Sequence, residues 1–352
     1  MKTLFKERKE LILQALGEFL LRKDIKELLN LKWEKELPEK LVCYTAGGKC
    51  LRGNLVLLGF EAAGGDIGKA PSLCKAAAAI ELFQSGILMH DDIIDGDALR
   101  RGKSAMHVEF AGFLKDRNIS RPEKTGESMA ICLGDIALML TFALLNETEC
   151  PPEILRRVNV YWGCEFAKVG AAEMEDTYLS GAQELPGVER ILALYRGKTA
   201  GYTFTLPLLT GAMLGGADEK LLERLREYAL ALGVLFQVKD DELGIYGDAE
   251  KLGKPVGSDI REGKKTVFWQ MLLEAASLEE REELKGIFGN PAPSMEMVER
   301  VRYLLEAKGI RSKVAALAES LALKAKKALE GFDGPRREIL LDLVEMSLER
   351  KA

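Results

Sequence analysis

The stretch IELFQSGILMHDDIIDGDALRR, residues 80–101, contains the most informative pattern in this chain of 352 residues. Its first half is apolar with helical spacing, and three carboxylates follow at Asp91, Asp92 and Asp95. Residues four apart share one face of a helix, so Asp91 and Asp95 lie together and repel each other. A hard divalent cation such as Mg²⁺ or Ca²⁺ would offset that repulsion. The pattern favours a metal site at the end of a buried helix, although an acidic helix end in water has the same composition.

A second acidic pair, Asp240 and Asp241, ends another apolar run, LALGVLFQVKDD, at residues 230–241. Helical bundles build metal sites from inward side chains of facing helices, so we expect these two helix ends to face each other across a cavity. Mg²⁺ prefers a few carboxylates together with phosphate oxygens of a substrate. The positive charges near the motifs are more than one diphosphate needs, which favours the binding of two diphosphates. These cations are Lys49, Arg52, Arg100, Arg101, Lys198, Lys254 and Lys264.

The composition is that of a globular protein, with 47% hydrophobic residues, 30% charged residues and a net charge of −5. No basic run is long enough for a nucleic-acid surface. Two histidines, and six cysteines without a CxxC pair, argue against a structural zinc site and favour reduced thiols. The charged N-terminus does not resemble a signal peptide, and Asp135 interrupts the longest apolar run. We therefore expect a cytoplasmic protein with no transmembrane segment and no nucleic-acid partner.

Helical periodicity dominates the chain, and no segment shows sustained strand alternation. The sequence therefore predicts an all-α fold, a single domain over residues 1–352 that forms one large helical bundle around a central cavity. We expect a turn near Pro38, a helix from about Lys49, a kink at Pro207, and a Gly- and Lys-rich loop between the second acidic pair and residue 266. The longer helices are expected at 5–31, 71–95, 123–146, 152–179, 188–214 and 218–243.

The apolar face below Asp91 includes Phe83 and Ile87 and would suit a long hydrocarbon tail, although ordinary core residues have the same spacing. Kinase and hydrolase functions have no motif to support them, because the chain lacks a P-loop, a GxGxxG sequence and a plausible Ser-His-Asp set.

An ordered set of motifs resembles the trans-isoprenyl diphosphate synthases of the polyprenyl synthetase family, and geranylgeranyl diphosphate synthases in particular. A single DDxxD is a weak signal, but the whole set is specific and spans most of residues 45–270. The motifs are GGKCLRG (47–53), ELFQSGILMHDDIIDGDALRRGK (81–103), LGD (133–135), GKT (197–199), FQVKDDELG (236–244) and GKPVGSDIREGKKT (253–266).

The resemblance implies a Mg²⁺-dependent condensation of isopentenyl diphosphate with an allylic diphosphate, of dimethylallyl, geranyl or farnesyl type, in a homodimeric enzyme. It implies three Mg²⁺ ions with substrate bound, held by Asp91, Asp95 and Asp240. By the same resemblance, Asp92, Lys198 and Thr199 are catalytic together with these metal ligands. Isopentenyl diphosphate would be bound by Lys49, Arg52, Gln84 and Arg101. The allylic diphosphate and its developing cation would be bound by Arg100, Lys198, Thr199, Gln237, Lys254 and Lys264.

Three positions upstream of Asp91 set product length in the family: Phe83, Gly86 and Ile87. Gly86 is small and Ile87 is not aromatic, so we do not expect these side chains to stop growth of the product at C15. Phe83 lies one turn deeper, which favours a C20 product, with C25 or longer next.

Two departures from the family pattern bear on the site. Gly244 stands where the family has the third aspartate of the second acidic motif. The second acidic motif therefore has one carboxylate fewer for binding metal. Glu173 stands where the family often has glutamine, so its place in the site is uncertain.

Two other functions remain open from the sequence. A non-catalytic subunit of a heteromeric synthase would lose acidic or basic motif residues, and only Gly244 points that way. A class I terpene cyclase shares the DDxxD motif, but it would need a different second metal motif and would not need Lys49 and Arg52.

Overall fold

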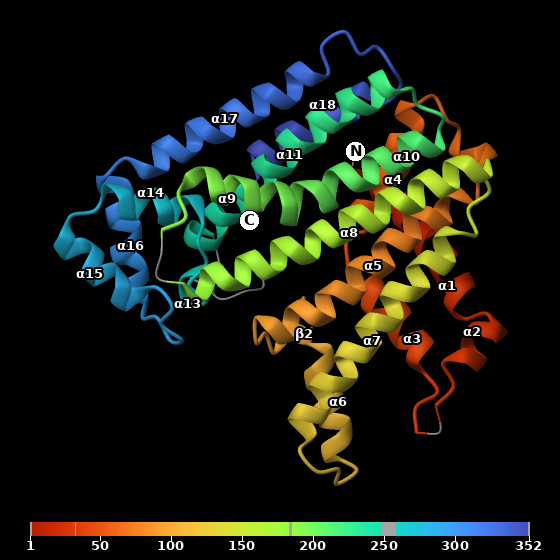
Figure 1. Cartoon of the computed structure of the whole chain (residues 1–352), viewed down its shortest axis with the longest axis horizontal. Coiled ribbons are helices and arrows are strands. Elements are labelled where there is room, and N and C mark those ends of the chain that lie inside the picture. The colour runs from red at the N-terminus through yellow and green to blue at the C-terminus, as the bar shows by residue number, and fades with distance from the viewer. Residues whose placement is uncertain (1, 32, 183–184, 248–257, 351–352) are drawn as a thin grey trace. The chain divides into compact units, whose positions relative to one another are not determined.

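The computed structural model describes residues 2–31, 33–182, 185–247 and 258–350 (Figure 1). Contacts between Cα atoms divide the chain into two compact units. The first unit is Met1–Asn159 with Thr210–Gly216, and the second is Val160–Leu209 with Ala217–Ala352. The expectation of a single domain over residues 1–352 stays a prediction.

The first unit is organised around α5 (Leu73–Ile94), which packs against α1, α3, α4, α6 and α7. Nearly every residue from Leu73 to Gly86 is buried, because this helix is apolar on all its faces. The acidic motif therefore follows directly from the most buried helix of the unit. The other elements are α1 (Lys2–Leu20), α2 (Lys23–Leu28), α3 (Leu37–Ala46), α4 (Leu51–Ala62), the 3₁₀ turn η1 (Ile67–Lys69), β1 (Leu99–Arg100), β2 (Lys103–Ser104), α6 (Met106–Lys115) and α7 (Pro122–Leu145).

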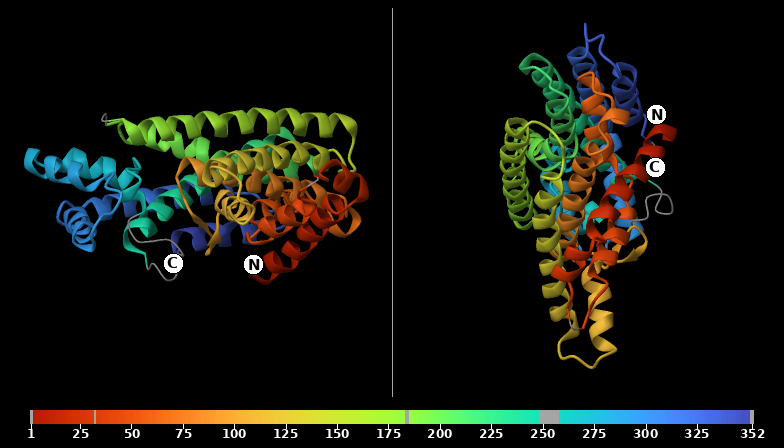
Figure 2. Two further views of the ribbon diagram at one scale, coloured as in Figure 1. Left: turned by 90° about the horizontal axis from the view of Figure 1, so that it is seen from below. Right: turned by 90° about the vertical axis from the view of Figure 1, so that its right-hand side faces the viewer.

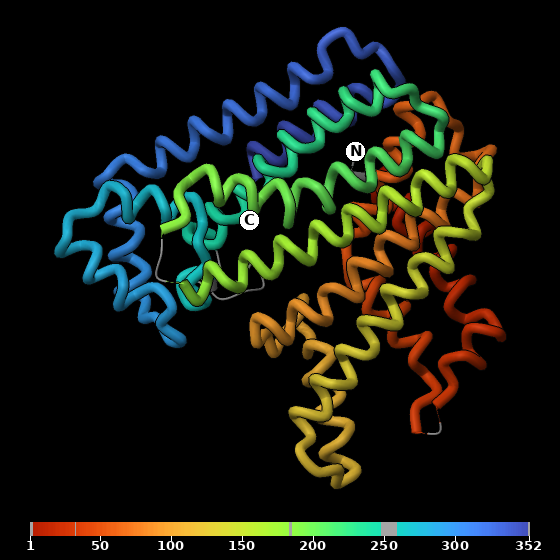
Figure 3. Tube along the Cα trace, viewed as in Figure 1, coloured from red at the N-terminus to blue at the C-terminus, as the bar shows by residue number. Residues whose placement is uncertain are grey.

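The second unit is organised around α11 (Glu219–Tyr246), which packs against the π-helical segment η2, α14, α17 and α18 (Figure 3). The second acidic pair lies near the C-terminal end of α11, so both acidic motifs lie at ends of central helices, as predicted. The other elements are α8 (Pro152–Gly181) and α10 (Leu206–Leu214), both of which cross the boundary between the units, α9 (Val188–Tyr195), η2 (Arg196–Thr205), α13 (Ser258–Arg261), α14 (Val267–Ala275), α15 (Leu278–Ile287), α16 (Met295–Ala307), α17 (Ile310–Ala328) and α18 (Arg337–Leu348).

The all-α class is confirmed, and the only strands among the described residues are the two-residue β1 and β2. The two strands form an antiparallel hairpin. Arg101 and Gly102 at its tip both have positive φ, 55° and 74°, which two-residue hairpin turns require. The sequence signal was weak because arginine seldom adopts this conformation. The hairpin fixes the position of both arginines that follow the acidic motif.

Three helix predictions in the first unit need correction. The expected helix over 5–31 is two helices, α1 and α2, separated at residues 21–22. Pro38 begins α3 instead of making a turn, because a proline in the first helical turn lacks only an N–H that would have no partner there. Helix α6 follows the hairpin, where no helix was predicted.

The expected kinked helix over 188–214 contains a π-helical segment, η2, in place of a simple kink. The hydroxyl of Thr205 donates to the carbonyl of Ala200, five residues earlier, over 3.0 Å. Pro207 lies just after this segment, near the start of α10, where its missing N–H is tolerated. The widened turns include Lys198 and Thr199, and π-helical turns are frequent at functional sites.

Helix α7 is long and apolar enough to cross a membrane by length and composition, and it is the one such helix in the described part of the chain. Of its most apolar window, 44% is buried, against α5 and α6 (Figure 2).

Two glycines allow α5 and α7 to pack closely. A Cβ on Gly86 would lie 2.8 Å from the carbonyl oxygen of Gly134, and a Cβ on Gly134 would lie 2.4 Å from Nε2 of His90. The His90 ring also reaches the Ile131 carbonyl at 3.1 Å and the Asp135 carboxylate at 3.4 Å. The glycine of the LGD motif therefore makes room for the turn of α5 that precedes Asp91.

We predict that Gly134→Ala lowers the free energy of unfolding by about 1–3 kcal/mol, because the added methyl group overlaps the His90 ring. Urea unfolding measures this change. Gly112→Ala is the matched control, because Gly112 lies in α6 of the same unit with no atom near its missing Cβ. Equal stability of the Gly134 variant and the control would contradict this account of the helix contact.

Candidate functional site

Asp91 and Asp92 differ in environment although they are neighbours at the end of α5. The Asp92 side chain is fully buried, and it accepts hydrogen bonds from Nε of Arg100 at 2.5 Å and from the Tyr44 hydroxyl at 3.3 Å. Burial raises the pKa of the Asp92 carboxyl, and the bonds from Arg100 and Tyr44 oppose that rise. Asp91 and Asp95 remain partly exposed, one helical turn apart.

Arg100 neutralises this acidic helix end. Its Nη2 atom lies 3.4 Å from Asp91 and 3.8 Å from Asp97, in addition to its contact with Asp92. Such neutralisation is needed because negative charge at the C-terminal end of a helix opposes the helix dipole. The predicted allylic-diphosphate ligand Arg100 is thus positioned by carboxylates of the metal motif.

The GGKCLRG motif, residues 47–53, connects α3 to the first turn of α4 and contains the predicted diphosphate ligands Lys49 and Arg52 (the anion loop). Lys9 of α1, which the sequence did not indicate, donates to the carbonyls of Ala46 and Gly48 at 2.9 and 2.7 Å. Arg101 lies against the two glycines, and a Cβ on Gly48 would be 3.0 Å from its Nη2. Arg101 also donates to the Tyr44 carbonyl at 3.1 Å. The structure thus brings one predicted ligand of isopentenyl diphosphate onto the loop that carries Lys49 and Arg52.

A buried carboxylate, that of Glu81 on α5, holds the end of this loop through a hydrogen bond. It accepts the backbone N–H of Gly53 at 2.7 Å, in the first turn of α4, where the N-cap residue Cys50 provides no side-chain cap. Burial raises the pKa of Glu81, while Arg52 and Arg101 act in the opposite direction. Sequence reasoning missed Glu81, because a lone glutamate within an apolar run does not indicate its partner.

The remaining predicted residues of the first unit lie on α4, α5 and the loop. Lys49 is exposed, Phe83 and Gln84 are buried, and Ile87 is half-buried. Oε1 of Gln84 has no hydrogen-bond partner within the described residues, which fits a group that awaits a polar ligand. Gly86 faces the backbone of α7, so a larger residue there would disturb the helix contact as well as any tail cavity.

In the second unit, Lys198 lies between two carboxylates of α8. Its Nζ atom is 2.9 Å from Glu173 and 2.5 Å from Asp176, and all three side chains are partly exposed. Glu173, uncertain from the sequence, therefore contacts a predicted diphosphate ligand. Together the three groups carry one net negative charge.

Thr199 and Gln237 form a direct hydrogen bond. The Thr199 hydroxyl donates to Oε1 of Gln237 at 2.6 Å, and Nε2 of Gln237 donates to Asp241 at 2.8 Å. The other oxygen of Asp241 accepts a hydrogen bond from Tyr195. Burial, with Asp259 nearby, raises the pKa of the Asp241 carboxyl well above its usual range.

Asp240 is turned outward, with 51% of its side chain exposed. Nη1 of Arg350, from the end of the described chain, lies 2.9 Å from its carboxylate. The Arg350 guanidinium also stacks 4.4 Å above the Phe236 ring. The predicted metal ligand of this unit is thus accessible and already attracts a cation.

The missing aspartate at Gly244 has a structural explanation. A Cβ at position 244 would lie 2.6 Å from Oδ2 of Asp259, which belongs to α13. The Asp259 carboxylate therefore occupies the space that a side chain at 244 would need. Of the two lysines predicted in the adjoining loop, Lys264 pairs with Glu262 at 2.7 Å, and Lys254 lies outside the described residues.

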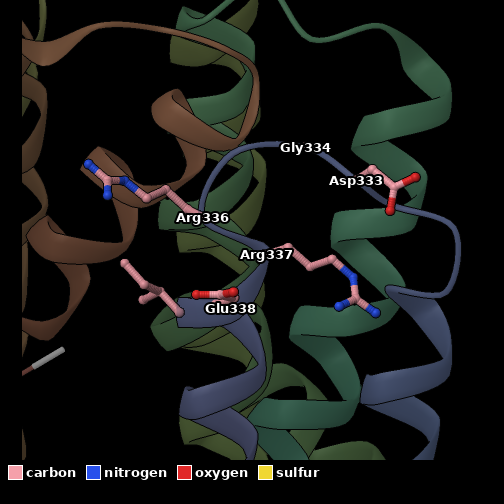
Figure 4. A pocket seen from close by; sticks show the side chains of 6 residues that line it. Asp333, Gly334, Arg336, Arg337 and Glu338 are labelled. Carbon is pink, nitrogen blue, oxygen red and sulfur yellow. The ribbon is translucent and has the colours of Figure 1, made fainter.

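Within the described ranges, no three His, Cys, Asp or Glu side chains form a ready-made metal cage. The acidic groups still fit Mg²⁺, which binds through one or two carboxylates plus substrate phosphate oxygens. Figure 4 shows a different feature, a surface hollow at the start of α18 with Arg336 and Arg337 pointing to opposite sides. None of the predicted site residues lines it.

We predict that Gly244→Asp lowers the free energy of unfolding by about 1–3 kcal/mol, through steric overlap and charge repulsion with Asp259. Urea unfolding measures the loss. Gly244→Ala, which adds only the methyl group, should lose less. Adding Asp259→Ala to the Gly244→Asp variant should recover stability. If the double variant shows no recovery, Asp259 is not the group that excludes a side chain at 244.

Comparison with known proteins agrees with these motifs. The polyprenyl synthetase family model matches residues 34–306. The short chain isoprenyl diphosphate synthase of Methanothermobacter thermautotrophicus is 34% identical over 311 residues, covering 87% of this chain and 88% of that protein. The geranylgeranyl diphosphate synthase of Saccharolobus solfataricus is 30% identical over 312 residues, covering 88% of each.

A solved structure is similar over nearly the whole chain. The geranylgeranyl pyrophosphate synthase from Corynebacterium glutamicum, complexed with isoprenyl diphosphate and magnesium, matches with a TM-score of 0.87 at 30% identity. The match covers 98% of this chain and 99% of that one. This chain therefore belongs to the polyprenyl synthetase family and is a prenyltransferase that elongates trans-prenyl chains.

Proposed function

We propose that this enzyme condenses isopentenyl diphosphate with an allylic diphosphate, head to tail, and releases mainly the C20 product geranylgeranyl diphosphate. The observation that carries the proposal is the β1–β2 hairpin. Its Arg100 is bonded to Asp92 and close to Asp91, and its Arg101 lies on the glycines of the anion loop. Two adjacent arginines therefore connect a carboxylate motif suited to a metal–diphosphate with a second site suited to an anion.

Divalent metal is assigned to the outward carboxylates. We propose that Asp91, Asp95 and Asp240 hold Mg²⁺, as three ions with substrate bound, and that these ions stabilise the leaving diphosphate during ionisation. The donors are hard oxygens, and Asp91 and Asp240 are partly exposed, which leaves coordination positions for substrate oxygens.

The remaining predicted residues bind and orient the two substrates. Lys49, Arg52, Gln84 and Arg101 bind isopentenyl diphosphate. Arg100, Lys198 and Lys254 bind the allylic diphosphate, whose starter is of dimethylallyl, geranyl or farnesyl type. Lys264 helps to close the site against water. The oxygens of Thr199 and Gln237 face the allylic carbon as positive charge develops there, and the proton lost after bond formation goes to the released diphosphate.

We also propose a homodimer in the cytoplasm, with α7 at the interface between two copies. Ile131 and Met139 lie two turns apart on one face of α7, and they are 40% and 67% exposed. Two exposed apolar side chains on so apolar a helix suit contact with a second copy of the chain. Light scattering of the purified protein should give twice the mass of the chain.

Product analysis tests the proposed reaction. The enzyme is incubated with labelled isopentenyl diphosphate, each allylic starter in turn and Mg²⁺, and the products are sized by chromatography. We expect extension to C20 that stops when the metal is chelated. Failure to extend any starter would exclude the reaction.

We predict that Phe83→Ala lengthens the product beyond C20, because it removes a bulky side chain about two turns below Asp91 on α5, one turn deeper than Ile87. The product size distribution measures this. Phe110→Ala is the control, because Phe110 is an equally buried aromatic residue on α6. An unchanged product from the Phe83 variant would show that another residue limits the length of the product.

We predict that Glu173→Gln lowers KM for the allylic diphosphate about 1.5- to 5-fold, because Lys198 is then held by one carboxylate and not two. Steady-state kinetics with varied allylic diphosphate measures KM. Glu175→Gln is the matched control on the same helix, where Glu175 pairs with Arg190 at 2.6 Å. An unchanged or higher KM in the Glu173 variant would show that the second carboxylate does not compete with substrate.

A further inference from the structure

A chain of hydrogen bonds in the second unit ends at Thr199. It begins at the backbone N–H of Val267, which lies 3.1 Å from the Tyr195 hydroxyl oxygen. From Tyr195 it continues through Asp241 and Gln237 to the Thr199 hydroxyl. The chain links four elements, because Tyr195 ends α9, Thr199 lies on η2, Asp241 and Gln237 lie one turn apart on α11, and Val267 begins α14.

The chemistry of each group fixes the direction of these bonds. A backbone N–H can only donate, so Val267 directs the Tyr195 proton toward Asp241. The carboxylate of Asp241 accepts from Tyr195 on one oxygen and from Nε2 of Gln237 on the other. The Gln237 amide is therefore held in one orientation, with Oε1 toward Thr199, and the Thr199 hydroxyl must donate to it.

Burial makes this arrangement rigid. Tyr195 is 6% exposed and Asp241 is 4% exposed, so water cannot replace either bond. Hydrogen bonds are stronger in such surroundings, and a broken one leaves a buried polar group without a partner. The α14 end is fixed too, because the Thr266 side chain caps that helix by accepting the N–H of Trp269 at 3.2 Å.

We propose that Tyr195 and Asp241 are positioning residues for Thr199. They hold Gln237 so that the Thr199 hydrogen is bound and its oxygen lone pairs are left for the allylic carbon as charge develops. The inference rests on the proposed role of Thr199 in the reaction. It gives the two aspartates of the second motif different tasks, because Asp240 is turned outward and Asp241 orients the threonine from within.

Tyr195→Phe tests the proposal, because it keeps the buried ring and removes only the hydroxyl. We expect the single-turnover rate to fall about 2- to 10-fold, the effect of one lost hydrogen bond. KM for both diphosphates should stay within about twofold, because neither Tyr195 nor Asp241 is among the diphosphate ligands. Tyr228→Phe is the matched control, because it removes another buried hydroxyl of this unit, bonded to the Leu340 carbonyl at 2.7 Å. The control should keep the wild-type rate even if its thermal stability falls.

A double-variant cycle separates positioning from general loss of structure. In a Thr199→Val background, Tyr195→Phe should cause no further loss of rate, because its effect passes through the missing hydroxyl. Asp241→Asn should behave in the same way, since one amide cannot accept from both Tyr195 and Gln237.

The outcomes distinguish the two ideas. An equal loss from Tyr195→Phe in both backgrounds would overturn the positioning role while leaving the role of Thr199 intact. A normal rate for Thr199→Val would overturn the role of Thr199 and the inference with it. If the Tyr195 variant does not fold, Asp241→Asn alone decides between the same outcomes.

Discussion

The buried contact of Asp92 with Arg100 is the interaction on which the candidate site residues of the first unit depend. A carboxylate taken out of water costs several kcal/mol unless a cation and hydrogen bonds compensate it. Arg100 and Tyr44 supply that compensation, and in doing so they hold the hairpin against the end of α5. Because the hairpin is fixed, its next residue, Arg101, lies on the anion loop, and Asp91 keeps its partly exposed position.

In the second unit, as in the first, one aspartate of the acidic pair is buried and its neighbour is exposed. Adjacent residues of a helix point about 100° apart, so an Asp-Asp pair at a helix end directs one carboxylate inward and one outward. Asp92 and Asp241 are the inward members, and each accepts a hydrogen bond from a tyrosine hydroxyl. Asp91 and Asp240 are the outward members, and each lies near an arginine. The inward carboxylates hold neighbouring side chains in place, and the outward ones are those that we propose bind metal.

Much of the fold and of the candidate site could be predicted from patterns of residues that lie close together in the sequence. Four of the long helices, α5, α7, α8 and α11, were predicted within a few residues, because apolar spacing and helix-starting prolines act locally. Glu81, Lys9, Tyr44 and Tyr195 were not predicted, because their partners lie 28 to 48 residues away and no local pattern links them. The π-helical segment was missed for a similar reason, since its widened turn is stabilised by packing against α11 as well as by its own bonds.

The sequence by itself determined the family, the reaction type and the carboxylates and cations that we propose serve it, because these depend on residue types at fixed spacings. Only the tertiary structure decided which member of each acidic pair is buried, which cation neutralises which carboxylate, and how Thr199 is oriented. It also explained Gly244, whose missing side chain leaves room for Asp259, fifteen positions along the chain. These outcomes depend on burial and on contacts between distant segments, and both exist only once the helices have packed.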